Sequence, residues 1–295
     1  SKSKVFGAPL PTLDVAYNGF VSGEGAGGLA GTLACTTTAL VLSPVSGNPY
    51  SINCSGQTST NYTFAYVPGT LTVTQATTSV VVTSSTNPSL LNQSVTFTAT
   101  VSPQFTGTPS GMVMFKDGAL TLGTGTLSGG AATFSTSALA AGMHSIMVVY
   151  GGDGNFAGSA SVALTQTVTY QTSGVCDGDL GHAILRPMNL EGTSVFKQGS
   201  TVPAKFRVCD AGGASVGAAG VVASFNLVRV VNGTIVQTVD EPVDSTTPDP
   251  AFRWDATGQQ WIFNIATKPL PANQTYVFLI TLNDGSTISF QYGLK

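Results

Sequence analysis

The chain has 295 residues, of which 42% are hydrophobic and only 8% charged, and its formal net charge is −3. Soluble domains usually carry about 25% charged residues, so we expect a surface made mainly of Thr, Ser, Asn, Gln and Gly. Eleven basic residues against fourteen acids argue against nucleic acid or an anionic membrane as partner. The sequence holds no run of 18 apolar residues, and its opening SKSK lacks the features of a signal peptide, so neither a membrane span nor a signal peptide is predicted.

Residues 1–76 alternate short apolar stretches with glycine-rich turns. Leu13, Val15 and Tyr17 occupy alternate positions, a pattern typical of a half-buried strand. Further strands are predicted at residues 32–42, 50–54 and 62–67. We expect the last of these to form a closing hairpin with residues 71–73 through the turn Pro68-Gly69.

Three stretches of this region carry a family resemblance: Val5-Phe6-Gly7-Ala8-Pro9, Tyr17-Asn18-Gly19-Phe20 and Tyr66-Val67-Pro68-Gly69-Thr70. With them, the region resembles the YGX-type MBG domain of bacterial surface and secreted repeat proteins. That family usually has Tyr-Gly at the opening turn. Phe6-Gly7 stands there in this chain, which loses a hydroxyl but keeps the ring. The resemblance implies a fold and no chemistry.

Residues 77–170 predict a second β module. Residues 94–101 alternate cleanly, with Val95, Phe97, Ala99 and Val101 expected to point inward. Lys116-Asp117-Gly118 is a strong hairpin signal. Residues 146–168 predict a strand, a turn shaped by Asp153 and Asn155, and a second strand with Val162, Leu164 and Val168 on one face.

About seven short strands at this spacing favour an immunoglobulin-like sandwich. Together with the run Tyr150-Gly151-Gly152-Asp153-Gly154-Asn155-Phe156, the region resembles the bacterial Ig-like repeat. That repeat is common in tandem on adhesins and stalks, and the bacterial type usually lacks cysteine, as this region does.

Residues 171–295 predict a third module with a more acidic surface. Asn232-Gly233 and Asp284-Gly285 indicate hairpin turns, and Trp261, Phe263 and Ile265 alternate on one apolar face. The motif Pro203-Ala204-Lys205-Phe206, with Phe252-Arg253-Trp254-Asp255 further on, resembles the PxKF domain found near the ends of bacterial extracellular proteins. The sequence thus predicts an all-β chain of three tandem modules at residues 1–76, 77–170 and 171–295. The short connector at residues 169–173 predicts a semi-rigid link between the last two.

Four cysteines form two local pairs, Cys35 with Cys54 and Cys176 with Cys209. Neither pair has the C-x-x-C spacing of zinc or redox sites. We interpret them as two disulfides within modules, which indicates an oxidising compartment. In the chain-entropy model each closure contributes about 3–4 kcal/mol. The alternative is two pairs of reduced, buried thiols.

Candidate sites for chemistry are few. Asp177 and Asp179 in a glycine loop could ligate calcium, but the rest of the calcium-loop pattern is missing and a structural loop is favoured. His144 and His182 are interpreted as structural or solvated. The acids at 240, 241, 244, 249 and 255 could suggest a glycosidase pair, although a solvated run is favoured. Trp254 is the one tryptophan that could lie at the surface and contact a ligand, by stacking on a sugar, although a position without ligand contact is favoured. No catalytic residue, metal or cofactor is predicted.

The sequence therefore predicts a non-enzymatic extracellular structural protein, secreted or on the bacterial cell surface, as part of a filament, stalk or adhesin. Self-association by strand addition is one expected partner mode, with residues 1–6 and 288–295 as candidate connectors. Two alternatives stay open. One is a carbohydrate- or host-binding adhesin that uses Trp254 and the loop 240–258 to contact a surface glycan. The other is an accessory segment of a larger secreted enzyme.

Overall fold

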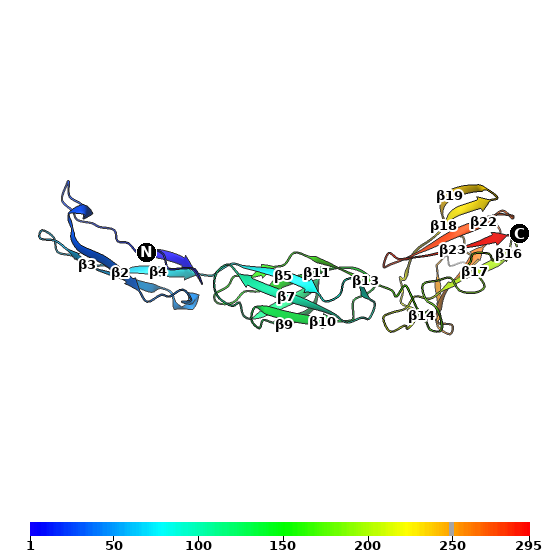
Figure 1. Cartoon of the computed structure of the whole chain (residues 1–295), viewed down its shortest axis with the longest axis horizontal. Helices are drawn as coiled ribbons and strands as arrows, with labels where there is room; N and C mark the ends of the chain where they lie inside the picture. The colour runs from blue at the N-terminus through cyan, green and yellow to red at the C-terminus, as the bar shows by residue number, and fades with distance from the viewer. Residues whose placement is uncertain (248–250) are drawn as a thin grey trace. The chain divides into compact units, whose positions relative to one another are not determined.

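The computed structural model describes residues 1–247 and 251–295, and strands make up nearly all of its regular structure (Figure 1). Two single-turn 3₁₀ helices, Ala26–Gly28 and Val45–Gly47, are its described helical elements. The chain divides into two compact units. The first comprises residues 1–83, 97–134 and 145–164, and the second comprises residues 84–96, 135–144 and 165–295. The all-β fold predicted from the sequence is confirmed.

A four-stranded sheet in the first unit has the order β1-β4-β3-β2. Its strands are β1 (Lys2–Val5), β2 (Ala30–Thr37), β3 (Tyr50–Thr58) and β4 (Gly69–Thr74). β1 runs parallel to β4, and the other pairs are antiparallel. Ile52 and Leu71 are buried on one face with Ala39, and Leu13 packs against them. The apolar residues of β3 and β4 alternate with polar ones because only this face is covered.

Two strands predicted in the first 76 residues do not form. Residues 13–17 and 62–67 belong to no strand, and the closing hairpin expected at 61–76 is wrong because β4 pairs with β3 and β1 instead. Leu13, Val15 and Tyr17 are nevertheless half-buried, and the residues between them are exposed. The alternation of apolar and polar residues at 13–17 therefore correctly indicated that one side of this segment is covered, but it did not indicate whether the backbone pairs with another strand.

The remaining strands of the first unit belong to two sheets. One has the order β10-β7-β5, formed by β5 (Thr78–Ser84), β7 (Val95–Pro103) and β10 (Ala131–Thr136). In the other, β11 (Gly142–Tyr150) lies between β8 (Met112–Asp117) and the short β12 (Ser159–Ala160), and β9 (Leu120–Thr126) follows β8. Val95, Phe97, Ala99 and Val101 are buried as predicted. The hairpin predicted at Asp117-Gly118 joins β8 to β9.

The second unit contains two facing sheets and two small pairs. The larger sheet has the order β16-β23-β22-β18-β19, and the smaller one β17-β21-β20. Their strands are β16 (Val195–Phe196), β17 (Thr201–Phe206), β18 (Val222–Asn232), β19 (Ile235–Pro242), β20 (Arg253–Asp255), β21 (Gln260–Ala266), β22 (Thr275–Leu282) and β23 (Thr287–Leu294). One pair, β14 (Val175–Cys176) with β15 (Asp179–Leu180), is a separate two-stranded sheet. The other, β6 (Ser89–Leu90) parallel to β13 (Leu164–Thr169), belongs to the same six-stranded sheet as β11, β8 and β9.

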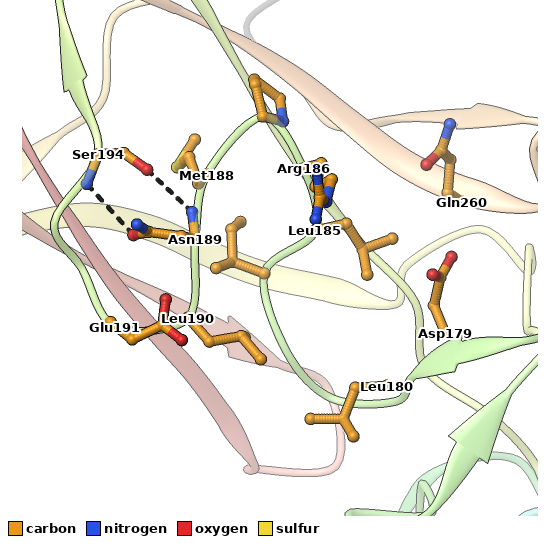
Figure 2. A pocket seen from close by; sticks show the side chains of 12 residues that line it. Asp179, Leu180, Leu185, Arg186, Met188, Asn189, Leu190, Glu191, Ser194 and Gln260 are labelled. Carbon is orange, nitrogen blue, oxygen red and sulfur yellow. Dashed lines mark hydrogen bonds between the residues drawn. The ribbon is translucent and has the colours of Figure 1, made fainter.

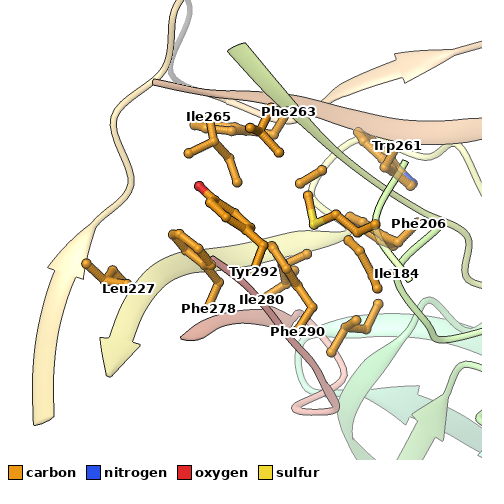
Figure 3. Close-up of a cluster of buried hydrophobic side chains, with 14 of the residues drawn as sticks. Ile184, Phe206, Leu227, Trp261, Phe263, Ile265, Phe278, Ile280, Phe290 and Tyr292 are labelled. Atoms are coloured by element: carbon orange, nitrogen blue, oxygen red, sulfur yellow. The ribbon is translucent and has the colours of Figure 1, made fainter. Parts of the chain in front are cut away.

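The core of the second unit is rich in aromatic residues (Figure 3). Phe206 and Phe263 come from the smaller sheet, and Phe278 and Phe290 from the larger one. The Phe278 and Phe290 rings stack with centroids 5.2 Å apart, an arrangement that adds to the stabilisation from burial alone. Trp261 lies in this core, as its place on an apolar face predicted.

Gln166 is the largest departure from the predicted inward residues. Val162 is 88% exposed, whereas the Gln166 side chain is fully buried in the second unit. Its Nε2 donates to Thr86 O (3.0 Å) and Ser89 Oγ (3.1 Å), and its Oε1 accepts from Ser84 Oγ (2.7 Å). A buried amide is tolerated because its hydrogen bonds are made. A pattern of apolar residues cannot reveal such a position.

Candidate functional site

Two disulfides join the cysteines in the pairs expected. Cys35 and Cys54 lie directly opposite each other on β2 and β3, with Cα atoms 4.0 Å apart. Cys176 on β14 bonds to Cys209, with Cα atoms 5.7 Å apart. The first bond ties two neighbouring strands of one sheet. The second ties the β14–β15 hairpin to the segment that follows β17.

The Asp177 and Asp179 carboxylates are both engaged by protein groups. Asp177 Oδ2 accepts a hydrogen bond from the Ser215 backbone N–H (2.9 Å), and Asp179 forms an ion pair with Arg207. Arg207 also donates to the backbone carbonyls of Asp177 and Gly258. This arrangement supports a structural loop held by one arginine.

Trp254 is half-buried on β20, directly opposite Trp261 on β21. The two ring centroids are 5.5 Å apart, and a Cβ placed on Gly217 would lie 2.2 Å from the Trp254 ring. Protein atoms thus lie against part of the ring that was the candidate for ligand contact. Of the acidic run, Asp249 lies outside the described residues, and Asp240 accepts a hydrogen bond from Asn226 Nδ2 (2.7 Å).

A broad hollow of about 810 Å³ lies in the second unit beside the segment 184–191 (Figure 2). Leu180, Leu190 and Glu191 border it, and Asn189 organises one side of the loop. The Asn189 N–H donates to Ser194 Oγ (2.9 Å), and Asn189 Oδ1 accepts from the Thr193 N–H (2.9 Å) and the Ser194 N–H (3.2 Å). The polar groups on this side of the loop therefore bind one another.

A second cavity, of about 540 Å³, lies in the first unit between residues 14–20 and residues 62–67. We call it the aromatic cleft. Ile52 and Cys54 of β3 also line it, and its aromatic lining residues are Tyr17, Phe20, Tyr62, Phe64 and Tyr66. These are the two segments predicted as strands that remain outside any ladder. Sequence reasoning missed the cleft, and the only local signal was the density of aromatic residues at 17–20 and 62–66.

Ring contacts and polar contacts organise the aromatic cleft. Phe20 meets Tyr62 edge to face with centroids 5.4 Å apart, and Phe64 stacks on Tyr66 at 6.0 Å. The Tyr62 hydroxyl donates to the Glu24 carboxylate. Lys2 Nζ donates to Asp14 Oδ2 at 2.7 Å, and this hydrogen bond lowers the pKa of Asp14. Asp14 is therefore ionised at neutral pH.

Contacts at one end of the four-stranded sheet form what we call the first joint. The Phe6 and Phe156 rings meet edge to face at 5.2 Å. The Ala76 N–H donates to Asn155 O (3.0 Å), and the Ala157 N–H donates back to Ala76 O (2.8 Å). The Val45 N–H donates to Asn155 Oδ1 (3.0 Å). The turn residue Asn155 thus also holds the chain on the other side of the joint.

Asp153 shapes this turn, as predicted. Its Oδ1 accepts from the N–H groups of Asn155 (2.8 Å) and Phe156 (2.9 Å), and its Oδ2 accepts from the Ser110 N–H (2.9 Å) and Oγ (2.6 Å). Burial alone would raise the pKa of Asp153, but these hydrogen bonds outweigh it and lower the pKa. The carboxylate is an ionised structural acceptor.

A second joint, entirely in the second unit, connects residues 91–92 and 170–171 with residues 209–211. The Ala211 N–H donates to Leu91 O (2.9 Å) and the Gln171 N–H to Cys209 O (2.8 Å). The Asn92 Nδ2 donates to Asp210 Oδ2 (2.7 Å). This joint therefore lies beside the disulfide at Cys209.

Tyr170 of the second joint and His182 both lie close enough to Asp284 for its charge to affect their pKa values. The Tyr170 hydroxyl donates to Asn283 Oδ1 (2.8 Å), and its N–H donates to Asp284 Oδ2 (2.8 Å). Burial, with the Asp284 charge, raises the pKa of Tyr170 to about 12. Both His182 ring nitrogens are buried without a hydrogen-bond partner among the described residues. Burial lowers the pKa of His182, and the Asp284 charge opposes this in part.

Across residues 1–247 and 251–295 no three His, Cys, Asp or Glu side chains are grouped to hold a metal ion. Within the same residues no helix has the length and apolarity needed to cross a bilayer. The cleft offers stacking surfaces and hydrogen-bond acceptors, and the joints offer structural hydrogen bonds.

Two family models match the chain. The MBG domain (YGX type) matches residues 1–72, and the bacterial Ig-like domain (group 3) matches residues 82–169. These two resemblances inferred from the sequence are thereby confirmed, whereas the PxKF resemblance of residues 171–295 stays a prediction. Comparison with curated proteins gave no match.

Several solved structures match the chain at low identity and low TM-score. The fibronectin(III)-like modules of Clostridium thermocellum CbhA are 13% identical, with 73% of this chain and 94% of that chain covered and a TM-score of 0.27. The titin I9–I11 tandem is 10% identical, with 88% and 81% covered and a TM-score of 0.28. The Yersinia pseudotuberculosis adhesin InvE is 14% identical, with 73% of this chain and 58% of that chain covered and a TM-score of 0.32.

Proposed function

We propose that this chain is a non-enzymatic structural protein that works outside the cell, as a segment of a bacterial surface stalk, adhesin or filament. The proposal divides it into three β modules, at residues 1–76, 77–170 and 171–295, the last being PxKF-like. The observation that carries it is the construction of the two joints. Each joint is crossed by main-chain hydrogen bonds and by buried or paired side chains, so tension applied to one module reaches the next without a flexible linker.

The disulfides fit a load-bearing role outside the cytosol. Such bonds persist in oxidising compartments, and each stabilises its module by about 3–4 kcal/mol in the chain-entropy model. Each also shields the residues between its cysteines from extension when the module is pulled. The low charge of the surface leaves few groups for salt to screen, which suits a protein exposed to changing external conditions.

Single-molecule force spectroscopy of the oxidised and reduced chain tests the mechanical role. The bridged cysteines are 19 and 33 residues apart in sequence. At about 3.4 Å per extended residue, and after subtraction of the bridged Cα–Cα distances of 4.0 and 5.7 Å, reduction should lengthen the unfolded first module by about 60 Å and the third by about 105 Å. Cys35→Ser with Cys54→Ser should give the first increment alone. Unfolding at negligible force with the disulfides intact would contradict the proposal, as would failure of a cell-impermeant label to reach the protein on intact cells.

Self-association by strand addition is the finer part of the proposal. The candidate connector at residues 288–295 is paired on both sides, since β23 pairs with β22 and β16, whereas β1 pairs only with β4 and has one free edge, although just one of its four residues is exposed. The free edge of β19 is the better site, because all but one of its residues are exposed. Negative-stain microscopy tests this, and only monodisperse monomers at high concentration would count against it.

A further inference from the structure

We propose that the aromatic cleft is a binding site for a neutral carbohydrate, a role separate from the structural one and located far in sequence from Trp254. Ligand sites are usually concave, about 300–1,000 Å³ in volume, and lined by aromatic residues with a few polar groups. The cleft has a volume of about 540 Å³ and combines five aromatic side chains with Asp14, Asn18 and Lys2.

The aromatic rings are available to a ligand. Tyr17, Phe20, Tyr62 and Phe64 are half-buried, and Tyr66 is 40% exposed. Their mutual contacts hold them in place. The ring centroids of Tyr17 and Phe20 are 5.9 Å apart, and the Phe20 ring in turn contacts Tyr62. Rings fixed before binding lose little conformational entropy when a ligand stacks on them. Sugars offer flat C–H faces that pack on such rings.

The polar groups select the class of sugar. The Asp14 carboxylate is exposed and ionised, so it can accept hydrogen bonds from vicinal hydroxyl groups, and charged acceptors make the stronger hydrogen bonds. Lys2 is the one basic residue in the lining, and its ammonium group is paired with Asp14. The Asp14 carboxylate would repel an anionic sugar but not a neutral one, so the proposed ligand class is neutral hexoses and N-acetylhexosamines.

A carbohydrate fits the cleft better than an extended peptide does. The ring faces and hydroxyl-binding groups of the lining would recognise a sugar directly. The segments 14–20 and 62–67 do carry backbone groups outside any ladder, and a peptide strand could use these. Peptide binding is therefore the competing outcome that the experiment must separate.

The test begins with the full, oxidised chain on an array of neutral hexose and N-acetylhexosamine oligosaccharides, beside a library of extended peptides. The strongest sugar is then titrated by calorimetry against the wild type and four variants. Tyr17→Ala and Asp14→Asn should each weaken binding at least tenfold. Phe105→Ala, which removes an exposed aromatic side chain outside the cleft, and Trp254→Ala should leave it within twofold.

Asp14→Asn preserves the shape of the side chain, so it tests the site even where Tyr17→Ala perturbs folding. The circular dichroism spectrum of each variant checks the fold. The proposal is overturned if no neutral sugar binds at millimolar concentration, if binding survives both cleft variants, or if peptides bind the cleft and sugars do not. None of these results bears on the response of the disulfides to force, so the structural role stands or falls separately.

Discussion

Gly7→Ala tests whether the first joint is a rigid connection. Gly7 has φ = +76°, and a Cβ at this position would lie 2.0 Å from Thr106 O. A non-glycine residue in this backbone region costs about 1–2 kcal/mol, and forcing an extra carbon into a packed site costs about 1–3 kcal/mol more. The joint should therefore lose about 2–5 kcal/mol of its closing free energy.

Gly23→Ala is the matched control. Gly23 also lies in the first unit at positive φ, +91°, but a Cβ there would meet no atom within 4 Å. It should show the conformational cost without the clash. The difference between the two variants therefore isolates the contact with residue 106, at about 1–3 kcal/mol.

Hydrogen exchange of the full chain, followed by mass spectrometry, measures this difference at the joint itself. The reporters are the Ala76 and Ala157 amides, which bond across the joint at 3.0 and 2.8 Å. They should exchange about 5- to 150-fold faster in Gly7→Ala than in Gly23→Ala, since each 1.4 kcal/mol is about a factor of ten. The exchange rates of amides in β22 and β23 should be the same in both variants. Equal exchange in the two variants would refute the reasoning.

Three further predictions concern single side chains. Tyr292→Phe removes a buried hydroxyl that has no hydrogen-bond partner in the described residues, and should raise the free energy of unfolding by about 1–3 kcal/mol; a loss measured by urea denaturation would contradict this. Burial lowers the pKa of His182 in the folded chain below the value near 6.5 of the unfolded chain. The unfolded chain therefore binds more protons as the pH falls from about 6.5, and the free energy of unfolding should fall with the pH. His182→Gln should flatten this dependence of the free energy of unfolding on pH, and an unchanged dependence would exclude His182 as its source. The hydrogen bonds that lower the pKa of Asp153 stabilise the first joint at pH values above the unfolded pKa near 3.9, and this stabilisation should disappear as the pH falls through the folded pKa. In Asp153→Asn the joint amides should exchange faster than in the wild type at pH 7, and their protection should depend less on pH in the acid range. Protection like that of the wild type both at pH 7 and in the acid range would count against the assignment.

Strands with a strict alternation and a recognisable turn were predictable from the sequence. Val95 to Val101 in β7, Trp261 to Ile265 in β21 and the β22–β23 hairpin all lie where the pattern placed them. In each of these elements, the buried face and the neighbouring turn or strand both favour the same β-strand at the same residues. The core of both units follows from these elements.

The joints and the cleft could not be predicted because they depend on residues distant in sequence. The Phe6-Gly7 motif was recognisable as a family feature, but its physical reason is contact with Thr106 and Phe156. The cleft arises where residues 14–20 and 62–67 lie on either side of one cavity. Alternation in each segment indicated only that one side is covered, and it could not show that the backbone has no ladder partner.

The outer strand of the larger sheet has a consequence for how copies of this protein meet. β19 is hydrogen-bonded on one side only, and Ile235 and Val236 are 69% and 57% exposed. Such an edge is a template on which a strand of a neighbouring chain can pair. The same strand ends in Asp240, Glu241 and Pro242, two like charges and a residue without an N–H. At high local concentration these three residues act as gatekeepers, because they limit how far a foreign strand can extend along the edge before charge repulsion and a missing donor stop it.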